Sequence, residues 1–283
     1  MPDIGVIGSV NLDMVATAPR LPGPGETVTG ATFSVHPGGK GANQALAARR
    51  LGASVWLLAM VGTDANAGPA LELLRRDGVD LDRALRDADH PTGVALIVVD
   101  GDGENQIAVA PGANSHLSPS DIDVSGFDAL ICQLEVPVET VTAGARAAEG
   151  LVVLNAAPVR EIPTPLVEAC DVIVVNEGEY IALRPVLDAS DALVVVTMGS
   201  RGAVARRSLQ EVGQAPAPRV NVVDTVGAGD TFVGALTVAL LDDMPVPDAL
   251  AWACAAGALA TTVPGAQPSI PTLDQLRDFL ENL

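Results

Sequence analysis

Aromatic side chains are scarce in this chain of 283 residues, where two Trp, one Tyr and four Phe make up 2% of the sequence. A nucleoside base needs an apolar or aromatic shelf, which is hard to build from so few rings. Positive charge is also scarce, because 35 acidic residues against 16 basic ones give a net charge of −19. An acidic chain repels phosphate backbones and anionic lipid surfaces. The composition therefore argues against nucleic acid and membrane as partners.

Lysine is rarer still, since Lys40 is the only one and the other basic residues are Arg. A single lysine is a candidate for a specific task, although an Arg bias also arises from genome composition. If this acidic chain handles a phosphate, positive potential has to be gathered locally. Backbone amides, a bound cation or a few placed side chains can each supply it.

Cysteine is limited to Cys132, Cys170 and Cys254, which lie far apart and show neither metal-site nor disulfide spacing. A reducing compartment is the simplest interpretation. No basic segment of the kind that opens a signal peptide precedes the first apolar strand. The longest apolar stretch, Trp252–Val263, is too short to span a bilayer. The sequence predicts a cytoplasmic protein.

The apolar pattern predicts an α/β fold built as a single domain over residues 1–283. Near-continuous apolar strands alternate with helical segments, which indicates a parallel sheet covered by helices on both faces. Two β pairs, near 12–35 and 93–110, interrupt this alternation and are expected to pair with each other as a small separate sheet. The second is expected to form a hairpin around Asp100–Gly103. Only 16 residues separate Asn176 from Leu193, and Pro185 is among them, so an ordinary crossover helix hardly fits there.

The stretch Asp224–Phe232 carries the strongest functional signal. It follows an apolar, strand-like run at Val220–Val223 and opens a segment with helical spacing. Gly227 and Gly229 would leave amide N–H groups uncovered at a helix N-terminus, where anions are favoured. Asp230 in the same turn could take the proton of an alcohol during phosphoryl transfer, or could simply cap the helix.

Polar residues follow several other predicted strands, where ligands bind in parallel sheets. Asn11 and Asp13 would face the same way and suit the vicinal hydroxyls of a sugar. Glu135 follows the strand that ends near Leu134 and is either a hydroxyl ligand or a solvated loop residue. The glycine-rich turn Gly38–Asn43 lets a backbone approach a ligand closely, and its Lys40 and Asn43 can donate to hydroxyl oxygens; alternatively it is a plain turn.

Three later segments suit a nucleotide and its ions, each with a plain structural alternative. Asn176–Glu179 could position a hydrated Mg²⁺, or be an acidic helix start. Thr197–Gly202 is a small loop at a strand end that is fit for a nucleotide. Gly265–Ser269 offers carbonyl groups to a monovalent cation, or is a simple turn. The chain has three histidines, which match no catalytic pattern and are expected at the surface: His36, His90 and His116.

Taken together, these motifs resemble those of the ribokinase-like carbohydrate kinases, the PfkB family, over nearly the whole chain. Gly38–Asn43 is similar to the first signature of that family and Asp224–Phe232 to the second. The resemblance implies a three-layer α/β sandwich with a mostly parallel central sheet and a small antiparallel β lid. It also implies ATP-dependent phosphorylation of D-ribose at O5, with Mg²⁺ and K⁺ as cofactors, and a homodimer formed through the lid.

The resemblance also assigns roles to residues of this sequence. Asp230 would be the base, and Gly227, Ala228 and Gly229 would form the anion hole for the phosphoryl group. The sugar would be held by Asn11, Asp13, Gly39, Lys40, Asn43, Glu135 and Asp230. The nucleotide would meet Asn176, Thr197, Gly199, Ser200, Gly202, Gly229 and Cys254, of which Cys254 stands where the family tends to carry a polar residue. Glu179 would hold Mg²⁺ through water, and K⁺ would be bound by Asp224, Val226, Ala260, Val263, Gly265 and Ser269.

Two alternatives to ribose phosphorylation stay open at this point. A kinase of the same fold could act on deoxyribose, a nucleoside or a ketohexose, although the polar sugar-binding set argues against a nucleoside. A non-catalytic sugar-binding regulator is a second alternative, which the presence of Asp230 and both glycines disfavours.

Overall fold

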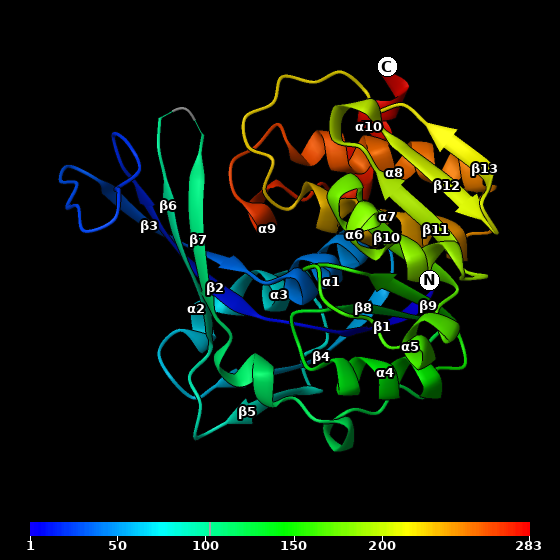
Figure 1. Cartoon of the computed structure of the whole chain (residues 1–283), viewed down its shortest axis with the longest axis horizontal. Helices are drawn as coiled ribbons and strands as arrows, with labels where there is room; N and C mark the ends of the chain where they lie inside the picture. The colour runs from blue at the N-terminus through cyan, green and yellow to red at the C-terminus, as the bar shows by residue number, and fades with distance from the viewer. Residues whose placement is uncertain (102) are drawn as a thin grey trace.

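The large sheet forms the centre of the molecule, which the computed structural model describes for residues 1–101 and 103–283 (Figure 1). It has nine strands, in the order β13-β12-β11-β10-β9-β8-β1-β4-β5. Neighbours from β11 to β5 run parallel, whereas β12 is antiparallel to both β11 and β13. The bounds are β1 Asp3–Ile7, β4 Ser54–Gly62, β5 Ala84–Asp87, β8 Ala129–Gln133, β9 Leu151–Asn155, β10 Val172–Asn176, β11 Leu193–Thr197, β12 Ala203–Arg207 and β13 Gln210–Ala215.

Helices cover both faces of this sheet, because successive strand residues point to opposite sides. In β10, Val172 and Val174 belong to one apolar core, and Ile173 and Val175 belong to the other. The first core is closed by α1 (Lys40–Arg50), α3 (Glu72–Asp77), α7 (Ala228–Leu241), α8 (Val246–Ala260) and α10 (Leu273–Glu281). The second is closed by α4 (Val138–Ala147), α5 (Thr164–Glu168) and α6 (Glu177–Asp188). The predicted three-layer α/β fold is confirmed.

The strand order reverses at β1, which lies between β4 and β8. After β1 the chain builds β4 and β5 on one side, and then returns to add β8 to β11 on the other. Loops at such a switch point diverge and leave a crevice at the carboxyl ends of the strands. The first turn of α1 packs against the end of β1 there, so closely that a Cβ on Gly41 would lie 2.5 Å from the carbonyl carbon of Gly8.

The smaller sheet stands to one side of the main body and contains β2 (Asn11–Thr17), β3 (Thr32–Gly38), β6 (Gly93–Val99) and β7 (Asn105–Ala110) (Figure 1). Its order is β3-β2-β6-β7, so the two predicted β pairs do meet. Each pair is antiparallel, and the two are joined by parallel pairing of β2 with β6. Within the β pair predicted near 12–35, the second strand begins only at Thr32. The predicted turn at Asp100–Gly103 includes residue 102, which lies outside the described residues.

The prediction that residues 177–192 leave no room for an ordinary crossover helix is wrong. Helix α6 has 12 residues and carries Pro185 inside it. A dozen residues suffice for a crossover between parallel strands. Pro185 and Ile181, four residues earlier, are both exposed, so water can solvate the carbonyl that the proline leaves without its helical partner.

The strand expected at Val220–Val223 is also absent, since no strand is assigned between Ala215 and Ala228. Val222 and Val223 are each 61% exposed, so this apolar run crosses the surface as an extended loop. Its backbone is held to the end of α8, because the amides of Val223 and Asp224 both donate to the carbonyl of Thr261 at 2.8 and 3.1 Å. The apolar residues of this segment predict a buried strand. The local pattern does not show whether other strands are available to pair with it.

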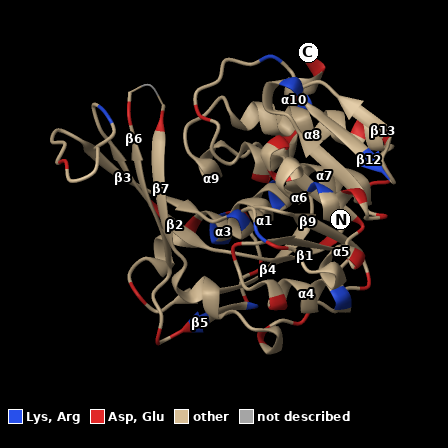
Figure 2. Cartoon of the chain, in the orientation of Figure 1, with Lys and Arg blue, Asp and Glu red and all other residues tan. Residues whose placement is uncertain are grey.

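Two short helices complete the fold, α2 (Ala67–Ala70) and α9 (Ala266–Ser269). Within the described ranges, no helix combines the length and apolarity needed to cross a bilayer. Acidic residues, in red, are scattered along the whole chain, whereas blue segments mark basic residues on α1 and α3 (Figure 2).

Candidate active site

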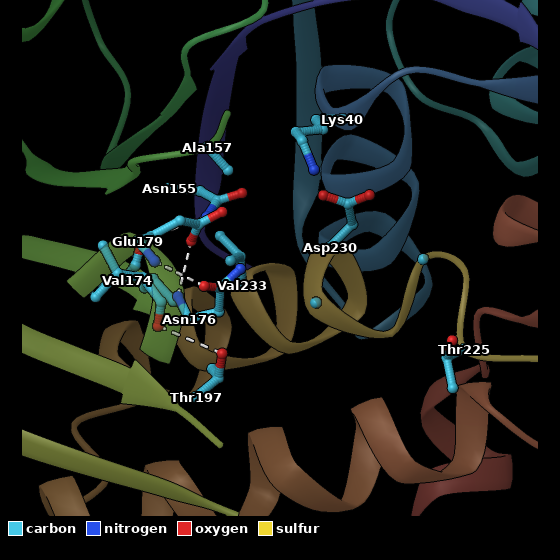
Figure 3. A pocket seen from close by; sticks show the side chains of 13 residues that line it. Lys40, Asn155, Ala157, Val174, Asn176, Glu179, Thr197, Thr225, Asp230 and Val233 are labelled. Carbon is cyan, nitrogen blue, oxygen red and sulfur yellow. Dashed lines mark hydrogen bonds between the residues drawn. The ribbon is translucent and has the colours of Figure 1, made fainter. Parts of the chain in front are cut away.

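A cavity of about 230 Å³ opens at the carboxyl ends of β9, β10 and β11, beside the first turn of α7 (Figure 3). Seven of the residues predicted for the site line it together. They come from helix starts and strand ends that are distant in the sequence, as expected at the switch point of a parallel sheet. These seven are Lys40, Asn176, Glu179, Thr197, Gly227, Gly229 and Asp230.

Asp230 is held by two carboxamides of α1. Asn43 Nδ2 donates to Asp230 Oδ2 and Gln44 Nε2 donates to Asp230 Oδ1, both at 2.8 Å. Asp230 is 7% exposed, and Gly227, the N-cap residue of α7, offers no side-chain cap. The hydrogen bonds assigned to the Asp230 side chain thus come from α1 and not from its own helix, α7. This arrangement favours an oriented carboxylate over the helix-cap interpretation.

The partners of Asp230 extend into a buried chain of carboxamides that the sequence did not reveal as part of the site. Gln133 Nε2 donates to Gln44 Oε1 at 2.7 Å, and Gln44 Nε2 also lies 3.0 Å from Asn155 Oδ1. Gln44 and Gln133 are fully buried. A signal was present, because Gln133 ends an otherwise apolar strand, and a buried amide needs partners.

Lys40 begins α1 and directs its side chain toward Asp230 (Figure 3). The charge of Asp230 raises the pKa of Lys40; burial opposes this, and Glu135 and Glu179 add to the rise. The only lysine of the chain therefore keeps its proton and brings a positive charge among three carboxylates. An anion that enters the cavity meets this ammonium group.

Of the residues predicted to bind the sugar, Asn11 and Asp13 lie at the start of β2 in the smaller sheet, and Glu135 follows β8. Asn114 Nδ2 donates to Asn11 Oδ1 at 2.8 Å and thereby orients it, a role that the sequence did not indicate. Glu135 Oε2 accepts from Ser9 Oγ at 2.5 Å and from Lys40 N at 3.1 Å. Burial, followed by repulsion from Glu135 and Asp230, raises the pKa of Asp13 to about 6. These carboxylates are close enough to interact and can accept bonds from sugar hydroxyls.

Amide groups at the start of α7 face the same cavity. Gly227 has a φ of 81°, and a Cβ there would lie 2.9 Å from Ala266 Cα, so this position requires glycine. The amide of Ala228 donates to the carbonyl of Thr225 at 3.3 Å. For the amides of Gly227 and Gly229, no acceptor is assigned within residues 1–101 and 103–283. Uncommitted amides at a helix N-terminus can bind an anion.

Asn176 and Glu179 start α6 and form a reciprocal capping box. Asn176 Oδ1 accepts from Glu179 N at 2.9 Å, and Glu179 Oε2 accepts from Asn176 N at 2.7 Å. The interpretation of Asn176–Glu179 as an acidic helix start is therefore confirmed. Both residues also line the cavity. The cap fixes the Glu179 carboxylate without using Oε1, so that oxygen can face a hydrated ion.

The segments predicted to hold a monovalent cation are joined by Asp224. Its Oδ2 accepts from Gly265 N at 2.8 Å, and its Oδ1 accepts from Val226 N at 3.0 Å. Ser269 Oγ donates to the carbonyl of Ala266 at 2.8 Å. The donor set of carboxylate, hydroxyl and backbone carbonyl oxygens is the kind that a hard cation takes. The members predicted for this set are Asp224, Val226, Ala260, Val263, Gly265 and Ser269, and their binding of a cation stays a prediction.

Four predicted nucleotide residues are not among those that line the cavity. Gly199 and Ser200 are exposed in the turn after β11, and Gly202 is buried at its end. Cys254, on the buried side of α8, is 6% exposed, and its Sγ lies 3.9 Å from the carbonyl oxygen of Ala215. The nucleotide contacts of this group stay predictions.

Comparison with known proteins matches residues 1–273 to the model of the pfkB family carbohydrate kinase. A ribokinase of Haemophilus influenzae is 36% identical, and the alignment covers 98% of each chain. A deoxyribokinase of Salmonella typhi is 35% identical, also over 98% of each chain. Relatives with both sugar specificities therefore match this chain over nearly its full length.

Solved structures of ribokinases also match this chain over nearly its full length. A ribokinase from Thermotoga maritima superposes with a TM-score of 0.91 and 31% identity, and the match covers 100% of both chains. A ribokinase of Arabidopsis thaliana, solved with ribose and ATP, superposes with a TM-score of 0.87 and 29% identity over 99% of both chains.

Proposed function

Because this chain belongs to the pfkB family of carbohydrate kinases, we propose that it transfers the γ-phosphoryl group of ATP to O5 of D-ribose. One observation carries the proposal. The Asp230 carboxylate, fixed by Asn43 and Gln44, lies in the same cavity as the uncommitted amides of Gly227 and Gly229. A positioned base beside an anion hole is what transfer to an alcohol requires.

In the proposed reaction, the oxygen of the sugar hydroxyl attacks the γ-phosphorus of ATP while Asp230 accepts the proton of that hydroxyl. The bond from phosphorus to the β,γ-bridging oxygen breaks, so that ADP leaves and D-ribose 5-phosphate forms. The amides of Gly227, Ala228 and Gly229 stabilise the charge on the transferring group. Ala228 has to release its bond to Thr225 to take part, and at 3.3 Å that bond is long.

The sugar is held on the lid side of Asp230 by Asn11, Asp13 and Glu135, with Gly39, Lys40 and Asn43 from the turn that opens α1. Their mixed donors and acceptors match hydroxyl groups, which are both. The nucleotide approaches from the side of Asn176 and Thr197, which line the same cavity. The Arabidopsis ribokinase solved with ribose and ATP supports this pair of ligands.

Two cations are part of the proposal. Glu179, and with it Asn176, fits a hydrated Mg²⁺, because one carboxylate oxygen is left over by the capping box. The oxygen set around Asp224 fits K⁺. Mg²⁺ would neutralise phosphate charge, and K⁺ would add positive potential behind the turn that carries Gly227. The protein's own part is to hold Asp224 between Val226 and Gly265.

Deoxyribose is a second candidate acceptor, favoured by the 35% identity to the Salmonella typhi deoxyribokinase. The two sugars differ by one hydroxyl group, and a site built to hydrogen-bond that group rejects the analogue that lacks it. The ratio of kcat/KM for D-ribose and 2-deoxy-D-ribose therefore decides between them.

The test is a coupled ADP-release assay over a panel of sugars, with and without K⁺, with the product identified by mass spectrometry. D-ribose 5-phosphate as the product, with a rate that rises with K⁺, is expected. Asp230→Asn keeps the shape of the side chain and removes the base, so kcat should fall by about 10²–10⁴-fold. Undiminished turnover in that variant would contradict the mechanism. Sugar binding without ADP release would instead support a non-catalytic regulator.

We also propose a homodimer formed through the lid. Three large apolar side chains that the strand register places on one face of the lid sheet are more than 40% exposed, namely Phe33, Val35 and Leu96. An apolar surface of this kind typically marks an interface. Analytical ultracentrifugation should show a dimer, and Leu96→Glu should shift it toward monomer.

For the compartment we propose the cytoplasm, because the three cysteines are free and buried.

A further inference from the structure

Two of the three histidines of this chain meet an aspartate at the base of the hairpin formed by β6 and β7. Asp87 ends β5, His90 lies in the segment that leads into β6, and His116 ends the 3₁₀ helix Gly112–His116 that follows β7. One potential ligand atom from each lies within 4.8 Å of the other two. The proposed kinase mechanism uses none of these three residues.

The three side chains are already organised around one another. His90 Nδ1 donates to Asp87 Oδ2 at 2.7 Å, and the rings of His90 and His116 stack with centroids 3.4 Å apart at 13°. The backbone amides of Asp89 and His90 both donate to Asp87 Oδ1, at 2.8 and 3.3 Å, and fix the carboxylate in place. The Asp87 side chain is 13% exposed and that of His90 is 40% exposed, so the cluster is open to water on one side.

We propose that Asp87, His90 and His116 bind one divalent transition-metal ion, with Zn²⁺ as the best fit. Imidazole nitrogen selects Zn²⁺, Cu²⁺ or Ni²⁺ over Mg²⁺ and Ca²⁺, which prefer oxygen. Three protein ligands with water in the fourth position form a common tetrahedral zinc site. The ion takes the place of the proton between Asp87 and His90 Nδ1, and that proton moves to Nε2 of the same ring.

Small side-chain movements complete the site. Ligands of a tetrahedral zinc ion lie about 3.3 Å apart, given bonds of about 2.0–2.1 Å. His116 is exposed and can turn its ring nitrogen toward the pair without disturbing the core. The backbone is already in place, since the amide of Ala113 donates to the carbonyl of Pro91 at 2.8 Å. A bound ion would therefore fasten the entry and the exit of this lid hairpin to the end of β5.

Titration calorimetry of the full chain with ZnCl₂ tests the proposal. Nucleotide is left out, because it chelates zinc, and millimolar Mg²⁺ is present to occupy oxygen-only sites. One equivalent should bind, and Co²⁺ in its place should give the absorption of a tetrahedral complex. Asp87→Ala, His90→Ala and His116→Ala should each weaken binding by at least about 10-fold. His36→Ala, which removes the third histidine, is the matched control and should leave the affinity unchanged.

A second measurement addresses folding and separates this site from the kinase site. Zn²⁺ at 100 times its Kd should raise the Tm of the wild-type chain by roughly 5 °C or more and leave that of the His90→Ala/His116→Ala variant unchanged. In zinc-free buffer that contains Mg²⁺ and K⁺, the double variant should phosphorylate the sugar as the wild type does. No zinc binding by the wild type, or equal binding by the double variant, would overturn the proposal whatever the kinase assay shows.

Discussion

Gln44 Nε2 lies 2.8 Å from Asp230 Oδ1, so a fully buried side chain of α1 fixes the carboxylate at the start of α7. Gln44 is itself fixed, because Gln133 Nε2 donates to its Oε1 at 2.7 Å. The proposed base thus has its orientation set by two residues that lie deeper than the cavity. Removal of this support should affect the reaction more than the binding of either substrate.

We therefore expect Gln44→Met, which keeps the volume and removes the donor, to lower kcat by about 10²-fold with little change in KM for the sugar. Asp230 would keep its bond from Asn43 but could rotate about it. Initial-rate kinetics over both substrates measure the effect. Gln214→Met, at an exposed position on β13, is the matched control. An unchanged kcat in Gln44→Met would show that Asn43 alone positions the base.

Gly229→Ala should separate folding from catalysis. A Cβ at Gly229 meets no other atom within 4 Å, so the substitution is sterically free in the unliganded protein. Alanine is also a better helix former by up to about 1 kcal/mol, so the Tm should not fall. The new methyl group would nevertheless occupy the side of the turn where the phosphoryl group is expected. We predict a loss of at least about 10²-fold in kcat/KM for ATP.

The matched control is Gly68→Ala in α2, where a Cβ also meets no other atom within 4 Å. Both variants should melt at or above the temperature of the wild type, and only Gly229→Ala should lose activity. Full activity in Gly229→Ala would place the phosphoryl group elsewhere in the cavity.

Asp13 should lower the stability of the unliganded protein at neutral pH. Its pKa rises from 3.8 to about 6 on folding, first through burial and then through Glu135 and Asp230. A raised pKa means that the folded state binds the extra proton between these two values, so stability falls as the pH rises through this window. Above pH 6 the full cost applies, up to about 3 kcal/mol.

Asp13→Asn removes this cost. The variant should match the wild type in denaturant unfolding near pH 4 and exceed it above pH 6, while sugar binding weakens. The difference in unfolding free energy should grow with pH and then level off. A difference that is independent of pH would show that the Asp13 carboxyl titrates normally.

The sequence predicted the parts of this site that are local. Asp230, Gly227 and Gly229 occupy one turn, and their chemistry follows from their spacing. The apolar strands from β8 to β11 were equally evident, because a strand buried on both faces has few polar residues. The layered fold and the grouping of polar residues at strand ends both follow from such local patterns.

What the sequence could not supply depends on packing between distant elements. Gln44 and Asn155 meet only because α1 and β9 lie beside each other in the fold. The run Val220–Val223 looked like a strand, since an apolar segment on the surface and one in a sheet have the same composition. A proline in a short crossover predicts a break, whereas the exposed position of Pro185 lets helix α6 continue through it.

A last prediction concerns Arg50, which connects the core to the segment Gly265–Ser269 of the proposed K⁺ site. We refer to this segment as the cation loop. Its Nη1 donates to the carbonyls of Gln267 and Ile270 at 2.9 and 2.6 Å, and its Nε pairs with Asp77 at 2.6 Å. The Arg50 side chain is only 9% exposed, so these bonds are little weakened by water. They hold the segment that directly follows Gly265.

Arg50→Met should therefore loosen this segment and raise the K⁺ concentration needed for half-maximal activity by about 10-fold, with a smaller effect on the rate at saturating K⁺. Arg49→Met is the matched control, because Arg49 lies in the last turn of the same helix but donates to the carbonyls of Gly78 and Ala53. Activity is measured as a function of K⁺ at constant ionic strength. Equal K⁺ dependence in the two variants would mean that the cation loop keeps its shape without Arg50, and would leave Asp224 as its main support.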